Sequence, residues 1–224
     1  EQVVLTNSDN ALNGLVKVAA QTLDLRSESL LLDTLNLAGN LSLNAGSIDQ
    51  QGAWAVAGTT RLQGGNVNLT DAGNALSGPV VLNSGDVTIQ QTGDLQVQGS
   101  ARTLNLSSAG RLGQSGALTV DAASMLDANT IDLSNTDNRF GGPVTLSASA
   151  SARIGSTGAL DLRANDTPDL TTLGSSNQTI QTRGVHNLNA QGGTVTLNVT
   201  DSIDTLTVNS TQLRQQSALK VNGD

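Results

Sequence analysis

The 224-residue chain contains no cysteine and no tyrosine, and its only aromatic side chains are Trp54 and Phe140. Without cysteine it can form neither a disulfide scaffold nor a thiolate-ligated zinc or iron–sulfur site. Compact domains usually bury much of their apolar surface in aromatic side chains. Hydrophobic residues make up 37% of this chain. We therefore expect a core assembled from many small, similar aliphatic side chains.

Positive charge is scarce as well, because 11 lysines and arginines stand against 19 acidic residues, for a net charge of −8. The cationic residues are scattered, so nothing could neutralise a run of phosphates, and we expect no nucleic-acid partner. No run of 18 apolar residues occurs, so we expect no transmembrane segment. The chain starts at Glu1 with neither a start methionine nor a signal peptide, and we interpret it as a segment of a longer protein.

The sequence repeats itself with a 64-residue offset, and segments 5–20, 69–84 and 133–148 align without gaps. Such self-similarity is typical of repeat architectures. We divide the single segment 1–224 into repeats 5–68, 69–132 and 133–196 and a degenerate repeat 197–224. The shared positions are Leu5, Leu69 and Leu133; Asn10, Asn74 and Asn138; Gly14, Gly78 and Gly142; Pro79 and Pro143; and Val16, Val80 and Val144.

Between these positions apolar and polar residues alternate, as in Leu41-Ser-Leu43, Val87-Thr-Ile89 and Leu104-Asn-Leu106. This alternation predicts short, half-buried strands, and the glycine, asparagine, serine and aspartate residues between them predict turns. The two Gly-Pro-Val segments are expected at corners, where proline suits the first residue of a strand. Glycine there would allow a backbone geometry closed to other residues.

We predict an all-β fold, a right-handed parallel β-helix (a solenoid) in which each strand pairs with its equivalent in the next coil. A 64-residue super-repeat divides into three coils of about 21 residues, giving roughly ten coils and a rod on the order of 50 Å long. Alternation is lost between Ala164 and Ala190, which predicts an irregular loop region at about 164–190. A leucine-rich repeat matches only once, at Leu32–Leu41, and a β-sandwich would have longer, more aromatic strands.

Candidate functional residues concentrate in that irregular region, because loops on a rigid scaffold often carry function. The proposed ligand face comprises Asp161, Arg163, Asp166, Asp169, Arg183 and His186. Each also has a simpler interpretation, since a lone histidine suits a polar turn and Asp161 with Arg163 suits an exposed ion pair. Evenly spaced aspartates at 127, 132 and 137 could offer calcium ligands, but the G-G-x-G-x-D nonapeptide is absent. We expect no catalytic, cofactor-binding or metal-binding residues.

The motif N-x-[Leu/Phe]-x-G-[Pro]-V-x-L, best seen at Asn138–Leu146, alternates with blocks such as Gly110–Val120. This pattern resembles the shaft repeats of filamentous haemagglutinin-type exoproteins, well over residues 5–162 and loosely over 195–224. The resemblance implies a β-helical shaft exported by two-partner secretion from a Gram-negative bacterium. It also implies an outer-membrane transporter as partner, a secreted or cell-surface location, and a reason for the missing cysteines, since a disulfide would obstruct passage of the unfolded chain.

We therefore expect a monomeric shaft segment of a secreted adhesin, without enzymatic activity. Its ligand would be a glycan, a host receptor or a biofilm polysaccharide, so that it attaches to host cells, other bacteria or the biofilm. One alternative is the stick region of a contact-dependent growth inhibition toxin, which the sequence flanking this segment would reveal. Another is a polysaccharide lyase or hydrolase on the same fold, which would need a cluster of acids on one strand face.

Overall fold

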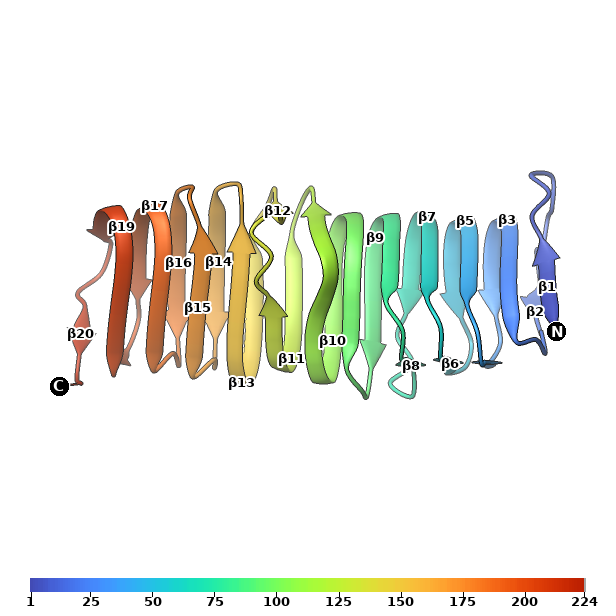
Figure 1. The fold of residues 1–224 in the computed structure, drawn as a ribbon, viewed down its shortest axis with the longest axis horizontal. Helices are drawn as coiled ribbons and strands as arrows, with labels where there is room; N and C mark the ends of the chain where they lie inside the picture. The colour runs from blue at the N-terminus through green and yellow to red at the C-terminus, as the bar shows by residue number, and fades with distance from the viewer. Residues whose placement is uncertain (224) are drawn as a thin grey trace.

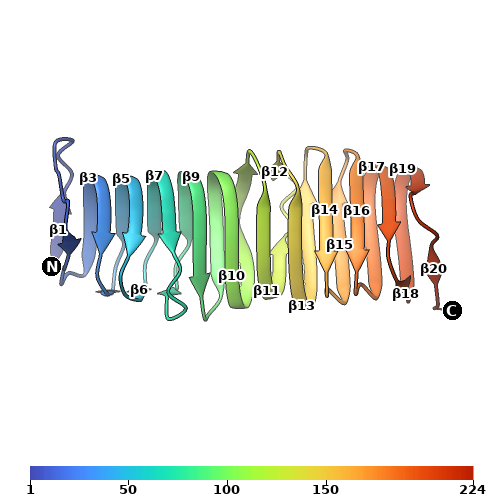
Figure 2. The same cartoon turned by 180° about the vertical axis from the view of Figure 1, so that it is seen from behind.

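The computed structural model describes residues 1–223 as a rod, with the two termini at opposite ends of its long axis (Figures 1 and 2). It is an all-β parallel solenoid of about 12 turns. This confirms the fold class predicted from the sequence. Residues 1–223 contain no helix, and in particular none with the length and apolar character needed to cross a membrane.

The rod contains strands of 2 to 26 residues. They are β1 (Gln2–Leu5), β2 (Leu15–Val16), β3 (Thr22–Leu32), β4 (Leu35–Leu37), β5 (Leu41–Gln50), β6 (Trp54–Val56), β7 (Thr60–Leu69), β8 (Ala75–Leu76), β9 (Val80–Gln91), β10 (Leu95–Val120), β11 (Ser124–Leu133), β12 (Arg139–Phe140), β13 (Val144–Ser156), β14 (Leu160–Asn165), β15 (Asp169–Gly174), β16 (Gln178–Arg183), β17 (Asn187–Val199), β18 (Ser202–Ile203), β19 (Thr205–Gln215) and β20 (Lys220–Val221).

Three parallel faces run along the rod, and a long strand bends at a corner to contribute to two of them. Face I contains Leu23 and its in-register partners Leu41, Thr60, Val80 and Val97. Face II contains Val67, Val87, Leu104, Ser124, Val144, Leu162, Ile180 and Leu197. Face III contains the short strands β4, β6 and β8 in the early turns, and Leu112, Ile131, Ala152, Leu170, Leu188 and Leu206 in the later ones.

Inward side chains stack into aliphatic columns because parallel pairing sets each residue directly over its equivalent, about 4.8 Å away. One column on face I contains Leu25, Leu43, Leu62 and Leu82, each at most 2% exposed. Burying one such side chain stabilises the fold by about 1.5–3 kcal/mol. The repeat positions Leu69 and Leu133 are fully buried in the same way, whereas Leu5 in the first turn is 46% exposed.

Turns are shorter than the sequence analysis expected. Val80 pairs with Val97, which closes a 17-residue turn, and Thr60 pairs with Val80, which closes a 20-residue turn. The rod therefore has about 12 turns rather than ten.

The 64-residue super-repeat consequently extends slightly beyond three turns. From Leu69, three turns along face II lead through Ile89 and Leu106 to Leu126, and seven further residues reach Leu133 on face III. Successive repeats are therefore rotated by one face around the rod. The 26-residue β10 lies where this change of face occurs and pairs with β9, β11 and β12.

The rotation moves one recurrent loop from corner to corner. In each copy an asparagine or aspartate side chain accepts a hydrogen bond from the backbone N–H two residues later: Asn7 from Asp9, Asp71 from Gly73, and Asn135 from Asp137. We refer to residues 7–10, 71–74 and 135–138 as the Asx loops. They follow face I, face II and face III respectively. In Figure 1 the first lies above β1 at the upper edge of the rod and the second beside β8 at the lower edge.

The expected irregular loop region at 164–190 is not present. These residues form parts of four regular strands, β14 to β17. The alternation was hidden because polar residues occupy inward positions: Gln178 stacks between Leu160 and Val195, and Thr172 and Thr182 are likewise buried. Apolar periodicity alone therefore mispredicted this region.

The Gly-Pro-Val corners require glycine because a larger side chain would clash with the preceding turn. The unusual backbone angles expected there are not observed. Pro79 and Pro143 directly precede β9 and β13, and their carbonyls accept hydrogen bonds from the N–H groups of Thr60 and Ser124. A Cβ on Gly78 would lie 2.2 Å from the carbonyl oxygen of Gly58. Glycine with positive φ occurs elsewhere, at Gly64, Gly99 and Gly184.

We predict that deleting residues 169–186 shortens the rod by one whole turn without unfolding it. Asp169 pairs with Asn187, so the new junction brings equivalent positions together and keeps every inward side chain inward. Deleting only 169–177 joins Pro168 to Gln178, so that the inward Gln178 takes the place of the exposed Asp169 and the side chains after it change faces. Thermal unfolding followed by circular dichroism should show a Tm within about 5 °C of the parent for the first variant and a larger decrease for the second. Equal destabilisation would contradict the observed register.

Candidate functional site

Two of the predicted ligand residues lie on the flat outer surface of face II. Asp161 and Arg163 project from β14, with 3.8 Å between a carboxylate oxygen and a guanidinium nitrogen. Each side chain is 47% exposed. Ion pairs of this kind contribute at most about 1 kcal/mol. The structure thus brings these two residues together as a surface ion pair.

Asp166 and Arg183 meet at the corner between faces II and III. The guanidinium of Arg183 lies 3.4 Å from the carboxylate of Asp166, and the backbone N–H of Asp166 donates to the Arg183 carbonyl at 2.8 Å. Asp166 adopts a φ of 48°, a left-handed conformation that aspartate tolerates better than most residues. One turn on, Gly184 donates its N–H to the Asp201 carboxylate. The corner is therefore a stack of hydrogen-bonded turns.

Asp169 and His186 contact partners that the sequence analysis did not identify. The Asp169 carboxylate accepts a 2.6 Å hydrogen bond from the Asn187 amide, whose oxygen accepts another from the Thr205 hydroxyl. His186 Nδ1 lies 3.3 Å from the Asp204 carboxylate. The six predicted residues thus form separate pairs along the rod rather than one convergent cluster. Across residues 1–223, no group of three acidic or histidine side chains is placed to hold a metal ion.

The repeat asparagine instead forms a buried polar centre. Asn138 is completely buried, and it exchanges two hydrogen bonds with Gln114, of 3.0 and 3.1 Å. Its side-chain oxygen also accepts from the Leu118 N–H at 2.8 Å, and its amide donates to the Leu133 carbonyl at 3.0 Å. This arrangement, which we call the amide lock, satisfies backbone groups left unpaired where the chain turns into an Asx loop.

The amide lock recurs one repeat earlier. Asn74 exchanges 2.9 Å hydrogen bonds with Gln50 and accepts a hydrogen bond from the Trp54 N–H. In the first repeat the side-chain amide of Asn10 donates to the Leu5 carbonyl at 3.0 Å, as its equivalents do, but no glutamine is bonded to it within residues 1–223. Sequence analysis identified the asparagines but missed the glutamines, although Gln50 and Gln114 also stand one repeat apart. This shared spacing could have identified the two glutamines as partners of the repeat asparagines.

Carboxylates on the rod surface are held by neighbours one turn away. A hydrogen bond from the Thr103 hydroxyl, at 2.6 Å, is the main cause that lowers the pKa of Asp86, and Arg102 adds to it. Burial acts to raise the pKa of Asp132, but hydrogen bonds from Ser134 and Arg111 outweigh it and lower the pKa. The contacts made by Thr103, Arg102 and Arg111 join adjacent turns from the outside, whereas Ser134 is two residues from Asp132 on the same turn.

Comparison with known proteins identifies one family. The family described as repeats of unknown function (DUF5649) matches residues 20–83 and 84–147. These are two consecutive 64-residue units, together more than half of the chain. No curated protein and no solved structure matches the sequence.

We predict that Asn138→Ala destabilises the rod by at least about 2 kcal/mol, because it leaves the buried Leu118 N–H without its acceptor and removes the hydrogen bonds to Gln114 and to the Leu133 carbonyl. Asn105→Ala is the matched control, since Asn105 is exposed on β10. Urea denaturation and amide hydrogen exchange around residues 114–138 would measure both. Comparable effects of the two variants would show that the amide lock is not a structural centre.

We predict that Thr103→Val raises the pKa of Asp86 toward the ordinary aspartate value of about 3.9, because it removes the principal hydrogen bond to that carboxylate. The lowered pKa stabilises the folded state above the ordinary value, and this contribution is lost as the pH falls through the folded pKa. NMR titration of the side-chain carboxyl carbon would measure the change. An unchanged pKa in Thr103→Val, with Thr88→Val as control, would contradict this assignment.

Proposed function

Because the chain belongs to the family of repeats of unknown function (DUF5649), its role must be inferred from its physical form, and we propose that it is a shaft segment of a secreted Gram-negative adhesin. In this role it holds the parent protein away from the cell surface. It also contributes to attachment to host cells, other bacteria or the biofilm matrix. The resemblance of its repeats to filamentous haemagglutinin-type exoproteins supports the proposal.

The observation that carries the proposal is the continuous, mainly aliphatic core that extends from Leu23 to Ile203 in a rod of about 12 stacked turns. In a solenoid each turn contacts only its neighbours, so added repeats increase length and leave the cross-section unchanged. Each 64-residue repeat extends the rod by roughly 16 Å, at about 4.8 Å per turn. Such a fold suits a spacer whose reach is set by repeat number.

The same architecture suits export of an unfolded chain. The chain contains no cysteine, so no disulfide can form before or during passage through an outer-membrane transporter. Parallel pairing connects each strand to the turns immediately before and after it. A turn that emerges can therefore add to the turn before it without waiting for distant sequence. We accordingly propose a two-partner secretion transporter as partner and the bacterial surface as location.

Attachment of protein-coated beads tests the adhesive part of this proposal. Fluorescent beads carrying the 224-residue protein should attach to cultured epithelial cells or to a Gram-negative biofilm more often than beads carrying Leu126→Asp. Leu126 is fully buried on face II, so this variant disrupts the rod while changing one residue. Equal attachment by both kinds of bead, at equal coating density, would reject the adhesive role and leave only that of a spacer.

A further inference from the structure

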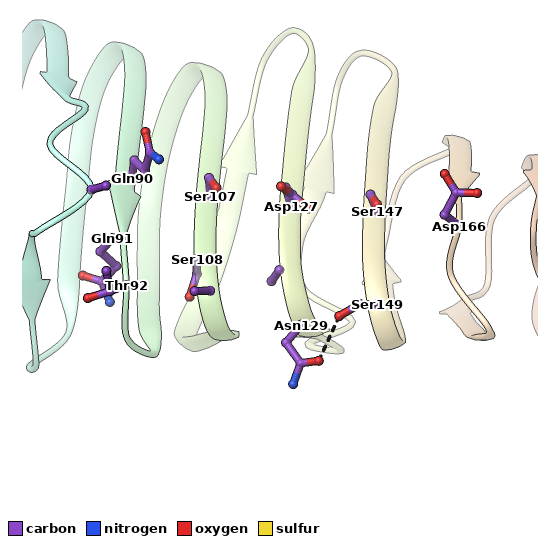
Figure 3. A pocket seen from close by; sticks show the side chains of 13 residues that line it. Gln90, Gln91, Thr92, Ser107, Ser108, Asp127, Asn129, Ser147, Ser149 and Asp166 are labelled. Carbon is purple, nitrogen blue, oxygen red and sulfur yellow. Dashed lines mark hydrogen bonds between the residues drawn. The ribbon is translucent and has the colours of Figure 1, made fainter.

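A groove of 470 Å³ lies at the corner between faces II and III, a part of the surface outside the predicted ligand face except for Asp166. Figure 3 shows its side chains distributed along the rod axis. Gln90, Ser107, Asp127 and Ser147 are in register on four consecutive turns. At one end the groove reaches Ala72 in the second Asx loop, and at the other it reaches Asp166.

A second groove, of 370 Å³, lies at the equivalent place in the next repeat. Its lining residues Thr136, Ser156, Leu173 and Gln191 stand one repeat after Ala72, Thr92, Ala109 and Asp127 of the first groove. Thr136 belongs to the third Asx loop, which follows face III rather than face II. The second and third repeats therefore each form a groove beside their Asx loop, and the two grooves face different corners of the rod.

The chemistry shared by the two grooves is that of hydroxyl and carboxamide groups. Serine, threonine and glutamine line both grooves; asparagine and alanine are added in the first, and Gly174 and Leu173 in the second. Hydroxyls and carboxamides both donate and accept hydrogen bonds, which suits a ligand that does the same. Within the described chain, neither groove is lined by an aromatic or cationic residue.

The negative charge of the first groove and of the whole chain argues against an acidic ligand. The first groove contains the carboxylates of Asp127 and Asp166, the second is lined by uncharged residues, and the chain as a whole carries a net charge of −8. A polyanion would therefore be repelled during its approach. An extended, uncharged chain rich in hydroxyl groups fits both the shape and the polarity.

We propose that each of these two repeats binds a neutral polysaccharide chain in its corner groove, with the chain lying along the rod axis. The inference rests on the proposed adhesive function and supplies its ligand class. A single groove exposed to water binds weakly, because water competes for every hydrogen bond. Grooves on successive corners engage separate polysaccharide chains, and several grooves on one rod raise the overall affinity through effective concentration.

The test is an NMR titration of the purified 224-residue protein with cellohexaose, maltohexaose and N-acetylchitohexaose, and with dextran sulfate as the acidic probe. At least one neutral probe should shift the backbone amides of residues 107–109, 127–129 and 147–149, and dextran sulfate should not. The double variant Ser107→Arg with Ser147→Arg should weaken this binding at least tenfold. The matched control is Asn105→Arg with Thr145→Arg, on the same strands two residues away and outside the groove, and it should bind like the parent.

No shift with any neutral probe, tighter binding of dextran sulfate, or equal weakening by the control pair would overturn the inference. Circular dichroism of both double variants establishes that they fold. Failure of the adhesive function is distinguishable, since beads that do not attach while a neutral probe still shifts the groove amides would reject adhesion and retain the groove. Beads that attach although no neutral probe shifts the groove amides would retain adhesion and reject the groove as a polysaccharide site.

Discussion

In-register stacking of inward side chains is the constraint on which the rest of this structure depends. Leu25, Leu43, Leu62 and Leu82 each lie over the previous residue of the column, and similar columns fill the rod between Leu23 and Ile203. Because the contacts are between equivalent residues, small aliphatic side chains suffice. The nearly aromatic-free composition thus follows from geometry, since no wide core has to be spanned by large rings.

Corners impose the second requirement, because backbone groups that leave a face lose their ladder partners. The amide locks at Asn74 and Asn138 supply those partners with side-chain amides that are themselves satisfied by Gln50 and Gln114. A fully satisfied buried polar centre specifies one conformation and tolerates little change. The recurrent spacing of asparagine and glutamine within this chain therefore reflects a hydrogen-bonding need at the corner rather than a ligand site.

Much of the fold could be predicted from the sequence, because alternation and the 64-residue offset both report directly on stacked strands. Leu69 and Leu133 are buried as alternation requires. The number of residues per turn could not be predicted in the same way. A 64-residue offset fits three whole turns as well as the three turns and one further face that the structure has. Polar residues in core columns, such as Gln178 and Thr182, concealed two regular turns behind an apparent loss of pattern.

The candidate site was less predictable than the fold. Charged residues close to Asp166 in the sequence were predicted to form one ligand face. The strand register instead places them in separate surface pairs. The grooves are lined mainly by serine, threonine and glutamine, which are ordinary residues for an outer strand position and carry no local signal. Only the superposition of turns brings Ser107, Asp127 and Ser147 into one line. Their significance therefore arises from tertiary geometry.

The rotation of each repeat by one face has a consequence for how a long shaft meets its surroundings. After three repeats, or roughly ten turns, an Asx loop returns to the side from which it started, about 48 Å further along. The Asx loops thus follow a helical path around the shaft. Every flank of such a filament presents the same features at regular intervals, so contact with a neighbouring surface does not depend on how the filament is rolled about its own axis.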